Sequence, residues 1–396
     1  MILNDICEFI VDCPHTTAPD EGAGYPLIRT PNIGKGRLVL NGVHRVSEKV
    51  YRQRIQRGMP QDNDLIFARE APAGNVAIVK NGEKVCLGQR TVLLRPDKSK
   101  VCPDYLVYYI LAPAQQYKLL GTANGATVAH VNLPVIRNMP VELPPLEVQE
   151  IVAGYLSAYD NLIENNQKQI KLLEEAAQRL YKEWFVDLRF PGYEDTPIVD
   201  GVPEGWSLSP ISDFGEVVTG KTPSTEKKEY YGGNIPFVKI PDMHGCVYPV
   251  ITESSLTEAG AKTQINKFIP RNGIMVSCIA TVGLVNIAVE RCQTNQQINS
   301  IILSDERDLY YVFSAMKRLK ELLEGVGSNG ATMTNVNKTK FASLPVLYPS
   351  EELRDSYYSF CKPIFEKIYN LSLSVVGLKK ARDRLLPKLM SGEIEV

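Results

Sequence analysis

The chain contains two related halves, and this internal duplication constrains its fold more than any other feature. The segment Tyr25–Pro31 is echoed 210 positions later by Ile235–Pro241. A second motif, Gly-Ala-Thr followed by Val-Asn, occupies residues 125–127 and 131–132 and recurs 205 positions later at 330–332 and 336–337. Two copies of about 200 residues exclude a solenoid, which stacks many short repeats. We therefore expect two modules of one fold that do the same kind of work.

The composition is that of an ordinary globular protein of two or three domains. The 396 residues are 44% hydrophobic and 22% charged. The eight cysteines form no Cys-x-x-Cys pair and lie near no histidine cluster. This usage favours buried thiols in a reducing compartment over a zinc site or a disulfide framework. Because Met1–Asp5 lacks the cationic segment of a signal peptide, we expect a cytoplasmic protein.

The longest uncharged run, residues 272–289, does not predict a membrane span. Polar and glycine residues interrupt it, and its counterpart in the first half, residues 63–79, carries three charged residues. A span would need about 20 consecutive apolar residues. We predict a buried hairpin here and no contact with a membrane.

The overall charge of −1 is uninformative, but the charge is distributed unevenly. Residues 1–146 carry a net charge of +4, residues 147–205 of −7 and residues 206–396 of +2. Between Arg29 and Arg57, eight basic residues accompany a single acid, Glu48. Such a stretch can follow a phosphate backbone, or it can be the solvated face of a loop.

The local patterns predict a mixture of strands and helices in each half. Short β-branched and apolar runs, broken by Gly, Pro and Asn, indicate strands. A helix is expected at 104–120 and again at 309–323. The predicted fold class is therefore α+β, with two pseudo-repeated domains, rather than a parallel α/β sheet.

Each half ends in a heptad pattern that predicts a long helix. From Glu147 to about Asp187 apolar residues recur every seven positions, and no proline or glycine follows Gly154. An apolar stripe of this length requires a partner helix. We predict two antiparallel coiled-coil helices, each a rod of about 57 Å, that separate the two domains. Ordinary helices packed on their own domains are the alternative, and Asn166 in the seam is expected to fix the register.

The predicted seam residues are Ile163, Ile170, Leu173, Leu180, Ile368, Val375, Leu378 and Leu385. The predicted organisation is a first domain at 1–146, a long helix at 147–190, a linker and second domain at 191–347, and a second long helix at 348–396.

Residues 215–222 match the pattern of a phosphate-binding P-loop. In a working P-loop a hydrophobic strand leads into the loop and a helix opens directly after it. Here the preceding residues 207–213 are polar and broken by proline, Pro223 follows at once, and Val217-Val218 are typical of a strand. No apolar run ending in Asp follows to hold magnesium. Nucleotide binding through Lys221 is therefore kept only as an alternative.

Amide and basic side chains occupy corresponding places in the two halves, at Gln89-Arg90 and at Asn295-Gln296-Gln297. Gln and Asn can bind adenine edges, and Arg and Lys can bind guanine edges. Since no catalytic signature is recognisable, two similar modules at a fixed separation favour the binding of duplex DNA. For each amide taken alone, a hydrogen bond at a strand end is an equal alternative.

Three segments carry a family resemblance. Residues 143–152, Leu-Pro-Pro-Leu-Glu-Val-Gln-Glu-Ile-Val, run into the heptads and end at Leu180–Phe185. The C-terminal residues 385–394 and the two Gly-Ala-Thr motifs accompany them. Over essentially its whole length the chain resembles a specificity subunit of a type I restriction-modification enzyme.

The sequence departs from the family pattern in two places. The start of the chain lacks the tryptophan-containing lead-in that Trp206 gives the second half, so we expect either a short first edge strand or a misassigned start site. The entry to the second long helix, residues 348–352, is a weaker version of the Leu-Pro-Pro-Leu-Glu motif.

The resemblance implies two target recognition domains, each of which reads one half of an interrupted, asymmetric DNA sequence. The long helices would set the gap between the half-sites and bind two methyltransferase subunits, which restriction/translocase subunits join. The chain itself would be non-catalytic, and S-adenosylmethionine, ATP and magnesium would belong to the partners. The alternatives are a P-loop nucleotide-binding protein and a coiled-coil scaffold that does not bind DNA.

Within that family we expect DNA phosphates to be held by Arg29, Lys35, Arg37, Lys221, Lys227, Lys228 and Lys239. We expect base contacts from Arg69, Gln89, Arg90, Gln296 and Gln297.

Overall fold

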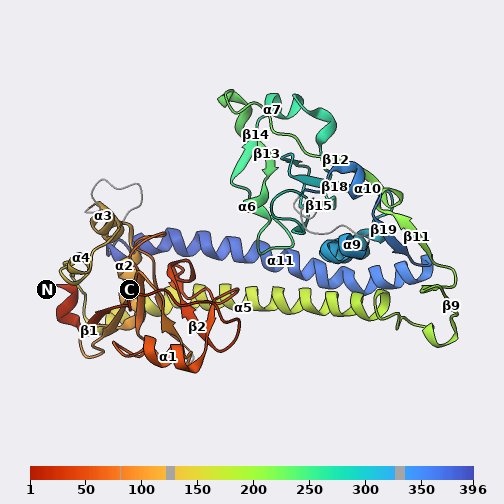
Figure 1. The fold of residues 1–396 in the computed structure, drawn as a ribbon. Coiled ribbons are helices and arrows are strands. Elements are labelled where there is room, and N and C mark those ends of the chain that lie inside the picture. The colour runs from red at the N-terminus through yellow and green to blue at the C-terminus, as the bar shows by residue number, and fades with distance from the viewer. Residues whose placement is uncertain (81, 122–129, 326–334) are drawn as a thin grey trace. The chain divides into compact units, whose positions relative to one another are not determined.

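The protein has a mixed helix-and-strand fold, which confirms the predicted class (Figure 1). The structure is a computed structural model that describes residues 1–80, 82–121, 130–325 and 335–396. The chain divides into two compact units, and both long helices run from one unit into the other. Unit 1 comprises Met1–Glu164 and Gly377–Val396, and unit 2 comprises Asn165–Val376.

Unit 1 is built on a five-stranded sheet with the order β1-β8-β5-β6-β3, in which only β3 pairs in parallel with its neighbour. The strands are β1 (Cys7–Asp12), β8 (Thr91–Pro96), β5 (Leu65–Ala68), β6 (Val76–Ile78) and β3 (Gly36–Arg37). A smaller sheet has the order β4-β2-β7, with β4 (Arg45–Val46) antiparallel and β7 (Cys86–Leu87) parallel to β2 (Tyr25–Ile28).

Both faces of the large sheet in unit 1 are buried. Alternate residues of a strand point to opposite faces, and Leu65 and Phe67 pack on one apolar cluster while Ile66 packs on another. The first cluster includes residues of helix α2 (Pro103–Leu111). Two buried faces explain why these strands read as continuous apolar runs rather than as alternating ones.

Unit 2 repeats this topology, except that β3 has no counterpart among the strands described in unit 2, and the repetition confirms the predicted duplication. Its larger sheet has the order β12-β18-β15-β16, and its smaller sheet has the order β14-β13-β17 with the same mixture of antiparallel and parallel pairing. The strands are β12 (Gly215–Thr219), β18 (Ile298–Leu303), β15 (Ile274–Ser277), β16 (Val285–Ile287), β14 (Ser254–Leu256), β13 (Tyr231–Val238) and β17 (Gln293–Thr294).

The two units differ in their first edge strand. In unit 2, β11 (Ser207–Pro210), which follows Trp206, pairs with β19 (Pro345–Tyr348) over four residues. In unit 1 the corresponding pairing is the single bridge between Ile2 and Pro140. The short first edge strand expected from the missing tryptophan segment is therefore present.

The helix expected at 104–120 is in fact two helices, α2 and α3 (Pro113–Gly121). Pro113 cannot donate the backbone hydrogen bond that a continuous helix needs, so the chain stops and restarts there. The counterpart in unit 2 is likewise split, into α8 (Leu309–Lys317) and α9 (Leu319–Gly325). The sequence analysis missed both breaks.

The conserved spacing of the Val-Asn motif has a structural reason that both units share, although both Gly-Ala-Thr triplets lie outside the described residues. Val131 and Val336 are each buried, and their amides donate to the carbonyls of Arg69 and Cys278 just beyond β5 and β15. Asn132 and Asn337 then stand at the N-caps of α4 (Leu133–Arg137) and α10 (Lys338–Ala342).

The remaining short helices lie in the loops around the sheets. They are α1 (Glu48–Arg54) in unit 1 and α6 (Ile240–Met243) and α7 (Glu258–Lys262) in unit 2. In unit 2, the uncharged run at 272–289 forms the antiparallel hairpin β15–β16, as predicted. Within the described ranges, no helix is long and apolar enough to cross a membrane.

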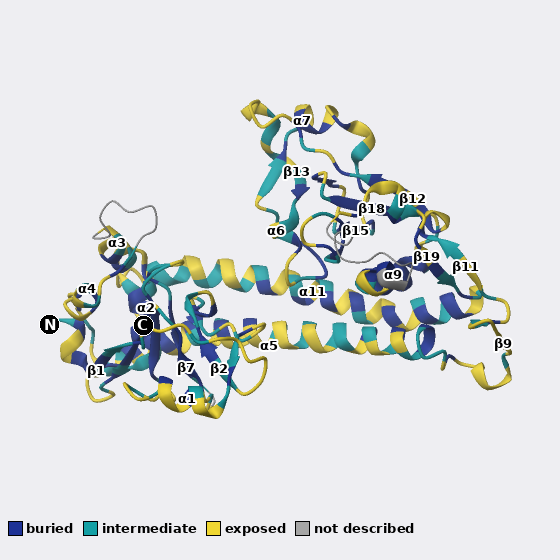
Figure 2. Cartoon of the chain, in the orientation of Figure 1, coloured by how far each residue is buried: buried dark blue, intermediate teal, exposed yellow. Residues whose placement is uncertain are grey.

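The two segments with heptad patterns form helices of 40 residues each, α5 (Leu146–Phe185) and α11 (Glu351–Met390). Their buried and exposed faces alternate along the length (Figure 2). In unit 1, Leu156 of α5 shares a core cluster with Leu389 of α11. In unit 2, the side chain of Asn166 donates to Ser374 Oγ (3.1 Å), and Trp184 packs edge-on against Phe360. These contacts make the helices antiparallel within unit 2.

Each predicted seam residue is at least half-buried. Ile163, Ile368 and Val375 are buried. The others, Ile170, Leu173, Leu180, Leu378 and Leu385, are half-buried.

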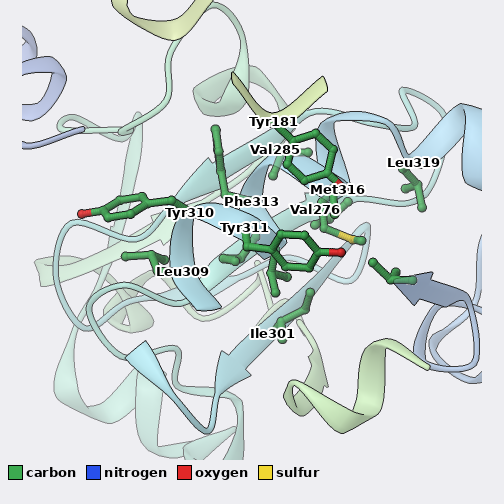
Figure 3. Close-up of a cluster of buried hydrophobic side chains, with 14 of the residues drawn as sticks. Tyr181, Val276, Val285, Ile301, Leu309, Tyr310, Tyr311, Phe313, Met316 and Leu319 are labelled. Atoms are coloured by element: carbon green, nitrogen blue, oxygen red, sulfur yellow. The ribbon is translucent and has the colours of Figure 1, made fainter. Parts of the chain in front are cut away.

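The core of unit 2 joins the sheet to the end of α5. Tyr181 of α5 packs on Tyr311 of α8, with ring centroids 5.6 Å apart. Val276 and Ile301 of the sheet lie in the same cluster (Figure 3). The long helix is therefore part of the domain core and not only a connector.

Candidate nucleic-acid interface

In unit 1, three strand ends meet at one edge of the five-stranded sheet. Because β8 is antiparallel to both β1 and β5, its start lies beside the ends of those two strands. The residues that flank these ends are the segment after Asp12, Arg69 after β5, and Gln89-Arg90 before β8. The structure thus brings together Arg69, Gln89 and Arg90, which the sequence analysis proposed as base contacts.

The same edge exists in unit 2. The end of β12 at Thr219 lies opposite Asn299, and the end of β15 at Ser277 lies opposite Ile298. Lys221, Gln296 and Gln297 flank these strand ends, so the structure brings these three predicted residues together as well.

Arg29 and Lys239 lie beside the two edges at equivalent places. Each follows the middle strand of the smaller sheet, and the parallel neighbour of that strand leads directly into the edge. Arg29 packs against Gly88, where an added Cβ would come within 2.9 Å of Arg29 Cγ. In unit 2, the amide of Asn295 donates to the carbonyl of Val238, which directly precedes Lys239 (3.2 Å).

The four other predicted phosphate contacts lie outside these edges. Lys35 and Lys228 are exposed and form no ion pair with any described residue. The amino group of Lys227 donates to the hydroxyl of Tyr230 (3.2 Å). Arg37, at the opposite side of the sheet, is engaged by helix α5.

Arg37 contacts Glu164 (3.3 Å) and donates to Asn161 Oδ1 (3.1 Å). These bonds fasten the sheet of unit 1 to α5. A DNA phosphate would have to compete with Glu164 for the same guanidinium, so the structure favours a structural role for this arginine.

Arg69 is held by three partners, which leaves it little capacity to contact a base. Its guanidinium donates to Asp12 Oδ2 (2.8 Å) and to the carbonyl of Val131 (3.1 Å), and it contacts His130 Nε2 (2.9 Å). Its side chain is only 13% exposed. Arg69 therefore ties β1 and the segment after α3 to the edge.

Arg90 is the most exposed charged group of the first edge. Its side chain is 63% exposed and pairs with Glu70, which also contacts His130 Nδ1 (2.5 Å). Its backbone has φ +63°, a conformation that costs a non-glycine residue free energy and that is found often at functional sites. DNA can displace a carboxylate partner from an exposed arginine, which a buried pair would resist.

The edge of unit 2 carries mostly neutral groups. Thr222 Oγ1 donates to Gln296 Oε1 (2.6 Å), and Asn295 Nδ2 donates to Gln297 Oε1 (2.9 Å). Lys221 is exposed and makes no ion pair within the part of the chain that the structure describes. The two edges therefore have one architecture but different chemistry.

The sequence analysis missed several residues of the edges, among them His15 and Thr222 in the loops after β1 and β12. It also missed Arg54, which is buried and holds the first of these loops. No local pattern marks Arg54 and Thr222, because the partners of their hydrogen bonds lie 33 or more residues away along the chain.

The P-loop interpretation of residues 215–222 is wrong. Gly215–Thr219 form strand β12 inside the sheet, and no helix opens after Thr222. The two glycines allow close strand packing: a Cβ at Gly215 would lie 2.1 Å from the carbonyl oxygen of Ile302, and one at Gly220 would lie 2.2 Å from that of Asn295. Without a loop of free amides at a helix start, there is no phosphate cradle.

The chain therefore contains two copies of one α+β module. Each copy has a polar strand edge and shares its core with the long paired helices. These features define a duplicated recognition protein. The chain matches the family model described as type I restriction modification DNA specificity domain over residues 1–175 and 203–357. It belongs to this family, whose members are non-catalytic specificity subunits of type I restriction-modification enzymes.

Named relatives agree with this assignment. The chain is similar to the HindI specificity subunit of a type I restriction enzyme from Haemophilus influenzae, with 28% identity over 84% of this chain and 86% of that protein. It is similar to the MjaIX specificity subunit from Methanocaldococcus jannaschii, with 27% identity over 95% and 88% of the two chains. The crystal structure of the S subunit from M. genitalium has the same fold, with a TM-score of 0.57, 14% identity and coverage of 98% and 95%.

Proposed function

We propose that the chain recognises a bipartite, asymmetric DNA sequence, with one half-site bound by each unit. The observation that carries this proposal is the repeated edge: β1, β5 and β8 of unit 1 correspond to β12, β15 and β18 of unit 2, yet the side chains presented differ. The first edge carries Arg90, Glu70 and His130, and the second carries Lys221, Gln296 and Gln297. Equal scaffolds with unlike side chains would read two unlike half-sites.

Affinity would come from cations that have no protein partner. Lys35, Lys221 and Lys228 are exposed and free of ion pairs within the described part of the chain. Contacts from such cations to phosphates release counterions, so binding should weaken steeply with salt. Arg29 and Lys239, beside the two edges, are suited to fix the orientation of the duplex.

The duplication also supports the binding of two copies of one partner. Tyr155 on α5 and Phe360 on α11 stand 205 positions apart, which is the shift of the repeat, and their exposed fractions are 55% and 60%. Exposed aromatic side chains at equivalent places are typical of protein interfaces. We propose that two methyltransferase subunits bind there and that restriction/translocase subunits join the complex.

The chemistry would belong to those partners, together with S-adenosylmethionine, ATP and magnesium. Among the described residues there is no group of His, Cys, Asp and Glu able to hold a metal ion. The chain would act in the cytoplasm, where the DNA is, as the part of the complex that selects the sequence.

The test is to express the chain with its methyltransferase subunit and sequence the modified DNA base by base. The proposal expects one adenine-methylated motif with two specified parts and an unspecified gap of fixed length. If the two proteins co-purify but neither a motif nor a DNA footprint appears, the chain is a scaffold without DNA recognition.

A further inference from the structure

The loop that follows β1 is held by side chains at four consecutive carbonyls. The guanidinium of Arg57 donates to the carbonyl of Cys13 (3.0 Å), and that of Arg54 donates to the carbonyls of Pro14 (3.4 Å) and Thr16. Gln89 Nε2 donates to the carbonyl of the intervening residue, His15 (2.9 Å). A surface loop normally leaves its carbonyls to water.

Arg54 makes this arrangement unusual. It is only 5% exposed, and its guanidinium also donates to the carbonyl of Leu87 (3.4 Å). Among the described residues it has no carboxylate partner. Burying a charge on carbonyls and a hydroxyl, without a carboxylate, is costly, so the arrangement indicates that the loop has to keep one conformation.

The side chains of this loop, in contrast, are open to solvent, although Thr16 Oγ1 accepts a hydrogen bond from Arg54 (3.4 Å). His15, Thr16 and Thr17 are exposed, and the imidazole of His15 lies 3.5 Å from Asp12 with 66% of its surface accessible. Imidazole and hydroxyl groups offer both donors and acceptors to base edges, and the threonine methyl group can contact thymine. A loop that is ordered before binding does not lose that conformational entropy on contact with DNA.

Unit 2 repeats the arrangement with different residues. Thr222 follows β12 as His15 follows β1, and Gln296 precedes β18 as Gln89 precedes β8, so both pairs are 207 positions apart. Thr222 Oγ1 donates to Gln296 Oε1 (2.6 Å), and the hydroxyl of Tyr231 donates to the carbonyl of Pro223 (2.7 Å). The contact between loop and glutamine is retained while the presented side chain changes.

We propose that the segment His15–Thr17 reads base edges of the first half-site, and that Arg54 and Gln89 are positioning residues that hold it. This inference rests on the proposed function, and in it Gln89 acts through the loop instead of contacting a base. The other polar groups of this edge, Arg69 and Arg90, are held by Asp12, His130 and Glu70. Among the described residues of this edge, the loop therefore exposes the polar side chains that are least engaged by the protein.

The experiment uses the full chain in complex with its methyltransferase. Competition binding against DNA libraries randomised in the first or in the second half-site would be measured for wild type, His15→Ala, Thr17→Ala and Gln89→Ala. Lys98→Ala is the matched control, because Lys98 is exposed just beyond the opposite end of β8. Since residues 15 and 17 are exposed, their replacement should leave the melting temperature unchanged.

We expect His15→Ala or Thr17→Ala to lower discrimination at positions of the first half-site by about tenfold and to leave the second half-site unchanged. Gln89→Ala should relax the same positions as His15→Ala. The double variant His15→Ala with Gln89→Ala should lose no more discrimination than the more affected of the two single variants, because the two residues act as one unit. The slope of affinity against salt should stay the same in all of them.

Two results would overturn the inference while the wild-type complex still recognises its bipartite motif. One is that His15→Ala and Thr17→Ala each change the base preference at every position of the first half-site by less than twofold. The other is uniform weakening on all sequences with a shallower salt dependence, which would make the loop a phosphate contact. If the wild-type complex shows no motif at all, the proposed function fails and this inference fails with it.

Discussion

The eight cysteines are all free, and their environment makes them unreactive. Burial raises the pKa of the Cys86 and Cys361 thiols to about 12 and that of Cys278 to about 11. Burial, and to a lesser degree the negative charge of Asp97, raises the pKa of Cys7 to about 12. The thiolate is the reactive form, so these side chains serve as small apolar core residues.

We therefore predict slow modification of the native protein by a thiol reagent at pH 8. A raised pKa leaves these thiols almost entirely protonated at pH 7 and at pH 9, so their absolute rate should stay far below that of a free cysteine at both, although the small thiolate fraction grows about tenfold per pH unit. In guanidinium chloride all eight should react at the rate of a free cysteine. Rapid reaction of several thiols in the native state would contradict the burial described here.

At this scale the sequence predicted where residues lie better than which partners they contact. It placed Gln89, Arg90, Gln296 and Gln297 at corresponding positions, and the structure puts them at corresponding edges. It could not predict that Arg69 is bound by Asp12, His130 and Val131, because those partners lie 57 to 62 residues away. Whether a donor is free depends on tertiary neighbours, which local patterns do not report.

The long helices are held differently in the two units. In unit 1, the Asp160 carboxylate of α5, 2% exposed, accepts hydrogen bonds from Tyr108 (2.7 Å) and from Arg382 of α11. A shift of 205 relates Asp160 to Phe365, Tyr108 to Phe313 and Arg382 to Ala177. These three counterparts are all buried in the apolar core of unit 2. One helix contact is thus polar in unit 1 and apolar in unit 2, which makes the two helix ends non-interchangeable.

We predict that Arg382→Ala lowers the free energy of unfolding by about 3–5 kcal/mol, because it leaves the Asp160 carboxylate buried without a cation. Arg384→Ala, an exposed neighbour on the same helix, should change it by less than about 0.5 kcal/mol. The double replacement Asp160→Leu with Arg382→Leu should recover most of the loss. Guanidinium unfolding followed by circular dichroism measures all three, and equal stability of Arg382→Ala and wild type would refute the role of the pair.

The heptads predicted the long helices closely, since the helix expected from Glu147 to about Asp187 runs from Leu146 to Phe185. Periodicity is a local property and is therefore readable from sequence. The partner of Asp160 is not local: Arg382 lies 222 residues away, seven positions after the seam residue Val375. The splits at Pro113 and Arg318 were missed because the apolar pattern continues across them.

At the scale of the whole molecule, duplication has preserved the scaffold and varied the surface. The strand orders, the left-handed residues Asn63 and Asn272 before β5 and β15, and the buried valines of the Val-Asn motif recur in both units. The side chains of the two edges do not recur. Such a division suits a protein whose partners must be bound twice in the same way while two different DNA sequences are read.

The equivalent aromatics on the long helices give a prediction about assembly. Tyr155→Ala and Phe360→Ala should each remove one of two bound methyltransferase subunits, and the double variant should remove both. Exposed Leu172 on α5 has no apolar counterpart, since the same shift reaches Gly377, so Leu172→Ala is the control. Native mass spectrometry of the co-expressed proteins gives the stoichiometry, and two bound subunits in the double variant would place the interface elsewhere.

Whether each unit reads its own half-site can be measured by sequencing the methylation produced by wild type and two double variants. Gln89→Ala with Arg90→Ala alters the edge of unit 1, and Gln296→Ala with Gln297→Ala alters that of unit 2. We predict one bipartite motif for wild type. Each double variant should relax a different half of it, with a loss of about 1–3 kcal/mol in base discrimination. Relaxation of the same half by both variants, or equal weakening on all sequences, would contradict the account.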